Sequence, residues 1–329
     1  MSPRLRGYGE ILGACLINGS IGVFVTWSTM PASMLVAVRM VFAALVLGAV
    51  VAARRDWKAL FADRATTVRL LVCGLALAGN LVCYFIAIRE TGVAVAIFLS
   101  YLAPLYVAVV APHLEGGRTE KAVYAALGVG LAGMALILVP GLTGEGVRLT
   151  GSGLLFALIA GLMYTVYLIG GKQLRRRDVH ATTIVFAMSV LAAVILLPIG
   201  LAQSSASQFT VRNFAIAAFL GVVCTALTFS LVMDGMHYIK VQHAAIMGYI
   251  EPVSAPLYAL VILSQVPSWW TVAGGVLIIG AGVIVVRWGA AEVDAEAELP
   301  GFALAGPGAE VHGASGPRAS LGGPRPGAG

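Results

Sequence analysis

The chain consists of long apolar runs separated by short polar and basic stretches. A bilayer core about 30 Å thick is crossed by roughly 20 apolar residues of α-helix, and ten runs have this length. They cover residues 11–30, 33–53, 70–88, 92–112, 122–140, 152–171, 181–201, 213–235, 243–263 and 269–287. Nothing alternates like the strands of about ten residues that build a membrane β-barrel. The pattern therefore predicts an all-α membrane protein with ten transmembrane helices.

The composition excludes most other classes of protein. Charged residues make up 11% of the 329 residues, hydrophobic residues make up 59%, and the mean hydropathy is +0.93. Soluble domains carry about 25% charged residues, so a soluble globular body is excluded, and so is a disordered chain. The four cysteines have neither zinc nor redox spacing, and the sequence predicts no metal site and no cofactor.

The basic residues indicate an orientation. If the N-terminus lies inside, 17 of the 21 Lys and Arg residues fall in inner segments, and only Arg89, Arg148 and Arg212 fall in outer loops. Basic residues accumulate on the cytoplasmic side of membrane proteins, so we expect both termini in the cytoplasm. The net charge of +6 is spread over short tracts and does not form the basic face of a nucleic-acid-binding protein.

Two halves of the chain resemble each other. Tyr101-Leu-Ala-Pro104 matches Tyr249-Ile-Glu-Pro252 at an offset of 148 residues, and the glycine pair Gly128 and Gly133 matches Gly275 and Gly280 at 147. Five helices per unit is an odd number, so the second unit starts on the opposite side of the membrane. We therefore expect a five-plus-five inverted repeat, the architecture of alternating-access transporters, with units at 10–140 and 150–287. The Gly/Pro-rich segment 289–329 is expected to be a disordered cytoplasmic tail.

Together these features resemble the EamA-type branch of the drug/metabolite transporter superfamily. The resemblance covers about residues 10–287 and includes Pro31 with Arg39, and the Pro104 and Pro252 segments that each lead into a Gly-rich helix. It implies a multi-pass carrier of metabolites or drugs in the bacterial inner membrane, often an exporter. The implied partners are a small-molecule solute and the lipid bilayer.

Ionisable residues inside a membrane are costly and are functional candidates by default. Glu251 lies within the ninth apolar run and precedes Pro252, so it is the candidate for proton coupling. Arg39 lies within the second run and is a candidate for the solute cavity. It could equally reach the outer interface, or pair with Glu251. Proline removes a backbone donor, so Pro104 and Pro252 are the expected kinks.

Polar and aromatic residues within the runs could line a cavity for amphipathic solutes. The candidates are Asn18, Trp27, Asn80, Tyr84, Tyr101, Tyr164 and Tyr249. For any single one of them a helix contact is an alternative role, and Trp27 and Tyr84 fit an aromatic belt at the interface. Asp234, His237 and His243 gather near the inner ends of the eighth and ninth runs, where we interpret them as a solvated rim.

The sequence thus favours a secondary active transporter, a proton-coupled exporter of small amphipathic metabolites or drugs. There is no phosphate-binding loop for direct use of ATP, and no nucleophile–base pair that indicates an enzyme. One alternative is an antiporter of anionic solutes such as phosphorylated or nucleotide sugars, which would need more intramembrane bases than Arg39. Another is a membrane-embedded enzyme acting on lipids, which would have to use Asp234, His237 and His243.

Overall fold

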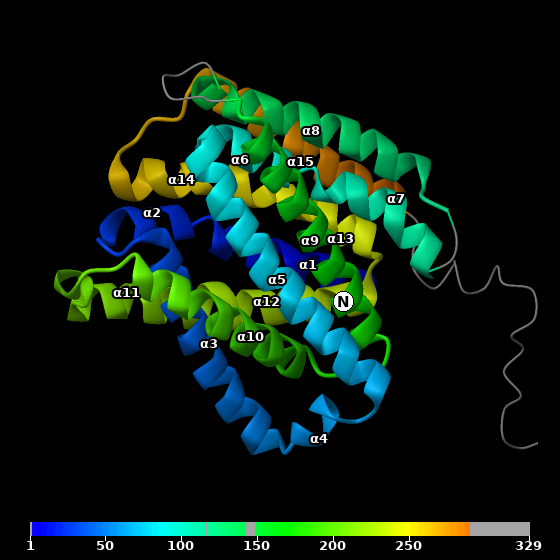
Figure 1. The fold of residues 1–329 in the computed structure, drawn as a ribbon. Helices are drawn as coiled ribbons and strands as arrows, with labels where there is room; N and C mark the ends of the chain where they lie inside the picture. The colour runs from blue at the N-terminus through cyan, green and yellow to red at the C-terminus, as the bar shows by residue number, and fades with distance from the viewer. Residues whose placement is uncertain (1, 116–117, 143–148, 290–329) are drawn as a thin grey trace, which may run out of the picture.

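The computed structural model describes residues 2–115, 118–142 and 149–289, and all the regular structure there is helical (Figure 1). Ten helical segments are long and apolar enough to cross a membrane, as the sequence predicted. The first one begins earlier than expected, at Pro3 instead of residue 11, because Ser2 caps it and its hydroxyl accepts a hydrogen bond from the Leu5 amide. Most of the predicted tail lies outside the described residues.

The first five spans contain seven helices. They are α1 (Pro3–Asn18) with α2 (Ile21–Trp27), α3 (Ala32–Arg54), α5 (Arg64–Thr91), α6 (Val93–Ser100) with α7 (Ala103–Glu115), and α8 (Lys121–Leu142). The short helix α4 (Trp57–Leu60) connects α3 to α5. The first and fourth spans are therefore each broken into two helices.

The last five spans are broken at the third and the fourth span. They are α9 (Gly151–Arg175), α10 (Ala181–Ala202), α11 (Val211–Gly221) with α12 (Thr228–Tyr238), α13 (Val241–Met247) with α14 (Glu251–Leu263), and α15 (Trp269–Trp288). A π-helical segment, Val222–Leu227, joins α11 to α12, and a 3₁₀ turn, Gly248–Ile250, joins α13 to α14. A further 3₁₀ turn, Ala206–Gln208, precedes α11.

The two halves match in their helix starts. Corresponding spans begin 147 to 149 residues apart, for example α6 at Val93 and α13 at Val241. Capping residues correspond as well: Asp63 caps α5 and Thr210 caps α11.

The packing between helices is related by the same correspondence. α3 packs on its counterpart α10 and α8 on α15, while α5 packs on α9 as α12 packs on α1. Figure 1 shows α8 and α15 side by side along one edge of the bundle. This reciprocal pattern is what a two-fold relation between the units produces, and five spans per unit make the repeat inverted.

Close packing of α8 on α15 depends on small residues. A Cβ atom at Gly133 would lie 2.6 Å from the Gly274 carbonyl oxygen, so the two backbones approach as in other glycine-lined membrane contacts. Of the glycine pairs that revealed the repeat, Gly128 and Gly280 face open space within 4 Å. Only part of the predicted glycine face therefore serves packing.

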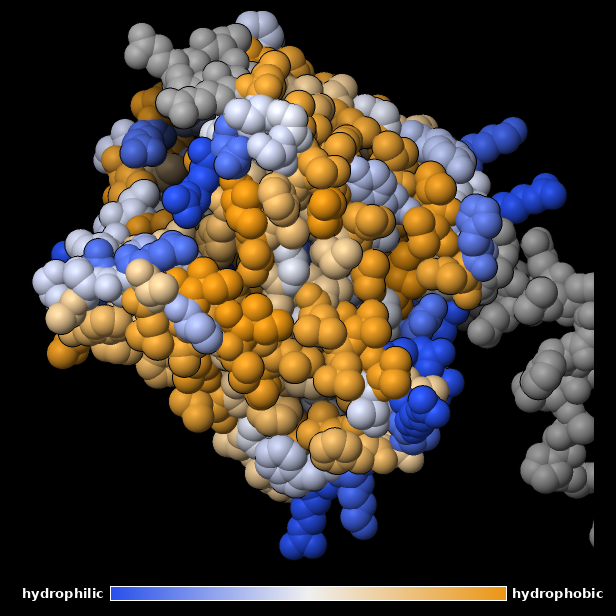
Figure 2. Space-filling model, viewed as in Figure 1, coloured by the Kyte–Doolittle hydropathy of each residue, from blue (hydrophilic) through white to orange (hydrophobic). Residues whose placement is uncertain are grey.

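The surface has the pattern of a membrane protein. In Figure 2 hydrophobic residues cover most of the visible face, and hydrophilic residues gather at its margins. We call the end of the bundle with Pro3, Arg54, Arg64, Arg175 and Lys240 the basic end, and the end with Trp27, Thr91, Leu263 and Trp269 the far end.

Candidate functional site

A cavity of about 580 Å³ lies between the two halves and extends to the far end. It is bounded by the α1–α2 junction, α5, α6, α8, α14, the segment 264–267 and the start of α15. Its walls are largely apolar, and its polar side chains are few. The lining residues that carry the argument are Asn18, Thr26, Tyr84, Tyr101, Glu251 and Gln265.

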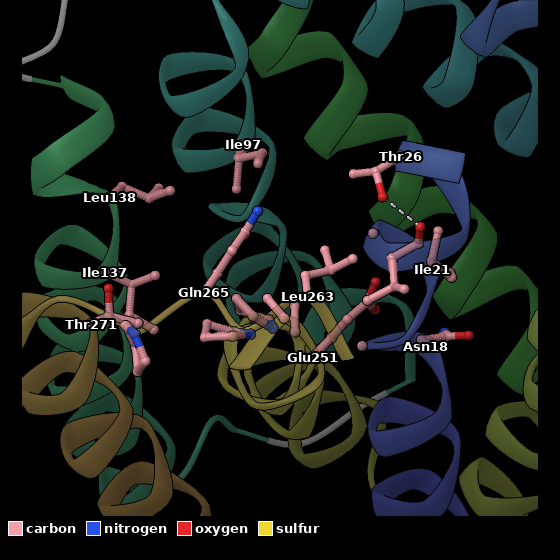
Figure 3. A pocket seen from close by; sticks show the side chains of 18 of the residues that line it. Asn18, Ile21, Thr26, Ile97, Ile137, Leu138, Glu251, Leu263, Gln265 and Thr271 are labelled. Carbon is pink, nitrogen blue, oxygen red and sulfur yellow. Dashed lines mark hydrogen bonds between the residues drawn. The ribbon is translucent and has the colours of Figure 1, made fainter. Parts of the chain in front are cut away.

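Glu251 reaches this cavity because the ninth span is broken beside it. The 3₁₀ turn Gly248–Ile250 ends there, and Glu251 begins α14 close to the middle of the span Val241–Leu263. Pro252 follows in the first turn, where a missing N–H costs nothing. Figure 3 shows Glu251 and Asn18 on one side of the pocket, and Ile137 and Leu138 on the opposite side.

Glu251 forms no ion pair with any residue that the structure describes; its side chain is hydrogen-bonded to the side chain of Asn18, and its backbone carbonyl accepts from the Ser254 hydroxyl at 2.9 Å. The Asn18 Oδ1 atom is buried and has no hydrogen-bond partner among the described residues. A buried polar atom is normally paired, so this oxygen and the Glu251 carboxylate beside it can accept bonds from a solute or from water.

Other polar groups of the cavity are satisfied locally. The Thr26 hydroxyl donates to the Val23 carbonyl at 2.7 Å, the dashed line in Figure 3. Thr271 lies at the start of α15, where its hydroxyl is 3.0 Å from that of the capping residue Ser268. Within the described lining, Glu251 is the only Asp, Glu, Lys, Arg or His residue.

Arg39 does not line this cavity. It is 9% exposed, its Nε donates to the Thr225 hydroxyl at 2.8 Å, and its Nη2 donates to the Cys224 carbonyl at 3.2 Å. Both partners belong to the π-helical segment, in which the wider backbone turn leaves carbonyls free for such bonds. The Arg39–Glu251 ion pair, one of the alternatives for Arg39, is not formed among the described side chains, because the guanidinium bonds to the segment between α11 and α12.

The remaining candidates fall into two groups. Tyr84 and Tyr101 line the cavity, as does Asn18. The others lie outside its lining: the Asn80 amide donates to the Ala160 carbonyl at 2.8 Å, Tyr164 packs edge-on against Tyr167, and Trp27 packs edge-on against Phe24. The functional role of each residue stays a prediction.

Tyr249 connects the two broken spans. It is fully buried, and its hydroxyl donates to the Tyr101 carbonyl at 2.9 Å, with the two rings 6.2 Å apart and nearly parallel. Tyr101 lies where α6 ends and α7 has not yet begun. Each span thus breaks just before its proline, Pro104 in one and Pro252 in the other. Unwound backbone at membrane depth occurs where it lines a cavity or is buried in protein.

At the basic end of the bundle, polar contacts join helices of the two halves. The Tyr8 hydroxyl is hydrogen-bonded to Nδ1 of His243 at 2.8 Å, and Nε2 of His243 lies 3.6 Å from a Glu120 carboxylate oxygen. Lys240 donates to the other Glu120 oxygen at 2.6 Å. Arg4 donates to the carbonyls of Val286 and Gly289. These bonds tie α1, α13 and α15 to the start of α8.

The predicted rim of Asp234, His237 and His243 is not one cluster. Asp234 pairs with Arg175 at 2.9 Å, and His237 packs edge-on against Tyr238. His243 is only 1% exposed, so a solvated rim is wrong for this residue: the N-terminal turns of α1 cover it. No group of three metal-ligating side chains occurs in the searched ranges 2–115, 118–142 and 149–289.

The sequence analysis missed Thr26, Gln265 and the apolar wall. A signal for Thr26 exists, because Asn18, Gly22 and Thr26 recur every four residues and all line the cavity. Gln265 follows α14, where no helical period applies. It also missed Lys172, a fully buried cation whose Nζ donates to the carbonyls of Met236 and Ile239 near the end of α12.

Comparisons with known proteins agree with this architecture. The model of the EamA-like transporter family matches the chain twice, at residues 5–139 and 151–287. An uncharacterized transporter of Archaeoglobus fulgidus is 35% identical over 202 residues, which is 61% of this chain and 70% of that protein. The threonine/homoserine exporter RhtA of Salmonella typhimurium is 27% identical over 70% of this chain and 73% of its own length.

A solved crystal structure shares the fold. Its TM-score is 0.72 at 20% sequence identity, and the match covers 86% of this chain and 97% of that chain.

Proposed function

The chain belongs to the EamA-like transporter family, and on this premise we propose that it exports a small amphipathic solute in exchange for protons. It is a multi-pass membrane protein and a transporter, not an enzyme. A lipid-modifying activity of Asp234, His237 and His243 has no support, because these residues do not form one site.

The orientation follows from charge. The basic end holds nearly all the basic residues of the described chain, so it lies in the cytoplasm, and both termini are cytoplasmic in the inner membrane. The cavity then opens to the outside, and the structure corresponds to an outward-open state.

Export requires the opposite state as well. In the cytoplasm-open state the bonds of Tyr8, His243, Glu120 and Lys240 separate, and the walls around Gln265 close. We propose that the units 10–140 and 150–287 rock against each other about Glu251, with Pro104 and Pro252 at the hinges. The reciprocal packing of the two units supports this movement, because neither unit encloses the cavity alone.

The observation that carries proton coupling is the Glu251 carboxylate, which faces the cavity without an ion pair to any described residue. A charged carboxylate at this depth is costly, and one without a cationic partner is free to gain and lose a proton as the cavity changes sides. The Glu120 carboxylate, by contrast, is ion-paired with Lys240 at 2.6 Å. Protonation of Glu251 from outside, followed by release inside, would drive the solute outward.

The cavity chemistry does not favour the alternative of an anion antiporter. No Lys, Arg or His lines the cavity among the described residues, and Arg39 is bonded to Thr225 and Cys224. An anionic solute would lie beside Glu251 without a counter-charge.

The test is solute flux in proteoliposomes with an imposed pH gradient, over a panel of amphipathic metabolites and drugs. For a transported solute, Glu251→Gln should reduce uphill flux to background while solute exchange survives. Glu90→Gln is the matched control: Glu90 accepts a hydrogen bond from Ser152 at the far end, outside the cavity, and its variant should transport like the wild type. Equal uphill rates for Glu251→Gln and the wild type would contradict proton coupling through Glu251.

A further inference from the structure

The cavity that lies between the two repeats has one charge, and the sign of that charge selects a ligand. Its described lining contains the Glu251 carboxylate, amide and hydroxyl groups, and apolar walls such as Ile97, Ile137 and Leu138. A ligand that satisfies this lining has an apolar body and one positively charged hydrogen-bond donor.

We propose that Glu251 binds the protonated amine of the solute directly, so that amine and proton compete for one carboxylate. The inference rests on the proposed function and adds the solute class: an amphipathic amine without net negative charge. Asn18 Oδ1, buried without a partner beside Glu251, supplies a second acceptor for the same ammonium group.

An ammonium group fits this site better than a neutral one does. It has donors and no acceptor, which matches the Glu251 carboxylate, whose side-chain hydrogen bond is to Asn18 alone, and the unpartnered Asn18 Oδ1 atom. Hydrogen bonds between charged groups are shorter than those between neutral groups and roughly twice as strong. The apolar body is accommodated by the α8 wall on the opposite side of the pocket (Figure 3).

Competition by protons at Glu251 requires that no other neighbouring group changes its charge over the same range of pH. The titratable groups that act electrostatically on Glu251 come from α1, α3, α5, the Tyr101 break, α9 and the π-helical segment. They are Cys15, Arg39, Tyr84, Tyr101, Tyr164, Tyr167 and Cys224. Thiols and phenols are neutral and arginine is charged throughout the acid and neutral range, so only Glu251 titrates there.

The experiment measures binding, not transport, to the purified full-length chain in lipid nanodiscs. Isothermal titration calorimetry compares three probes of similar shape: phenethylamine, phenethyl alcohol and hydrocinnamate. We expect the amine to bind about tenfold or more tightly than the alcohol, and hydrocinnamate to bind weakest. Below the pH at which the carboxyl group protonates, the amine affinity should fall about tenfold per pH unit, with proton release seen in buffers of different ionisation enthalpy.

Glu251→Gln should remove both the amine preference and the proton release, while phenethyl alcohol still binds and reports an intact cavity. Glu90→Gln should leave all three affinities unchanged. If Glu251→Gln does not fold, Glu251→Asp provides the second variant: it should keep the pH dependence with weaker amine binding. Equal binding of amine and alcohol by the wild type, no amine binding, or an amine preference that survives in Glu251→Gln would each overturn the proposal.

Binding and flux separate this inference from the proposed function. Loss of pH-driven flux in Glu251→Gln together with unchanged amine binding would overturn amine recognition and leave proton coupling in place. Glu251-dependent amine binding without flux in proteoliposomes would overturn proton-coupled transport and leave amine recognition in place.

Discussion

The fourth and ninth spans occupy equivalent places in the two repeats, yet only one of them carries a charge. Both break just before a proline, and Tyr101 and Tyr249 mark the breaks at the same register. In the ninth span the break presents Glu251 to the cavity, whereas the equivalent residue of the fourth span is Ala103, which is 2% exposed. The two repeats therefore share the backbone geometry of the break, but only the second repeat has a carboxylate there.

The two tyrosines differ in a related way. Tyr249 is buried against Gly130 of α8, and its hydroxyl donates a hydrogen bond to the Tyr101 carbonyl. Tyr101 lines the cavity, and its hydroxyl has no hydrogen bond to the part of the chain that the structure describes. The residue of α15 that corresponds to Gly130 is Leu277, so the second unit has no space for an equivalent ring. The tyrosine at the break of the ninth span is therefore fixed by packing, whereas the tyrosine at the break of the fourth span faces the cavity.

The largest expected effect comes from exchanging the carboxylate between the two breaks. Ala103→Glu places a charge at a buried site, and a carboxylate at the centre of a membrane helix costs about 2.5–3.5 kcal/mol. Glu251→Ala removes a carboxylate without an ion-pair partner among the described residues, and a carboxylate at this depth is costly, so the free energy of unfolding should stay unchanged or rise. Denaturant titration in mixed micelles checks both variants. Equal destabilisation by the two substitutions would show that the breaks are energetically equivalent.

A smaller effect is expected at Gly130, the residue that admits Tyr249. A Cβ atom there would lie 2.8 Å from Cδ2 of the Tyr249 ring, so Gly130→Val should cost about 1–3 kcal/mol by overpacking. Gly128→Ala is the control on the same helix, because nothing lies within 4 Å of a Cβ atom at that position. It should leave stability unchanged or raise it. Denaturant titration in mixed micelles distinguishes the two variants. A Gly130→Val protein as stable as the wild type would contradict tight packing of the Tyr249 ring.

Removing the two tyrosine hydroxyls sharpens the comparison further. Tyr249→Phe deletes the bond to the Tyr101 carbonyl and should lower the unfolding free energy by about 1 kcal/mol. Tyr101→Phe deletes a hydroxyl without such a bond and should change stability by less than about 0.5 kcal/mol. A larger loss in Tyr101→Phe than in Tyr249→Phe would reverse this assignment of the fixed and the open break.

The smallest effects concern the equivalent caps Asp63 and Thr210. Thr210 accepts from the Asn213 amide, and Thr210→Ala should cost about 0.5 kcal/mol at any pH. Asp63 accepts from the hydroxyl and the amide of Thr66, and these bonds hold the pKa of Asp63 below its ordinary value of 3.8. Its contribution is therefore complete above pH 3.8 and is lost as the pH falls through the lower, folded pKa.

Melting temperatures of Asp63→Ala and Thr210→Ala between pH 7 and pH 3 check this difference. The deficit of Asp63→Ala relative to the wild type should shrink on acidification, while that of Thr210→Ala should not. A deficit of Asp63→Ala that is independent of pH would show that its charge does not contribute to the cap.

Much of the fold was predictable because the bilayer restricts it. Ten apolar runs of helix length predict a bundle of ten transmembrane helices, since every backbone polar group of such a run in lipid must be hydrogen-bonded within its helix. The offset between Tyr101 and Tyr249 indicated the duplication, and Glu251 stood out because a carboxylate in an apolar run is rare. These conclusions depend on length, periodicity and composition, which are properties of the sequence.

Only the tertiary structure decided which polar residues meet. Arg39 and Glu251 are both intramembrane charges, but Arg39 bonds to Thr225 and Cys224 of the π-helical segment, while Glu251 faces the cavity. His243 is buried beneath Tyr8, 235 residues away in the sequence, and a carboxylate oxygen of Glu120, the residue before α8, lies 3.6 Å from its Nε2 atom. Such contacts depend on the rotation and depth of each helix, which packing between spans sets and no periodicity within one span records.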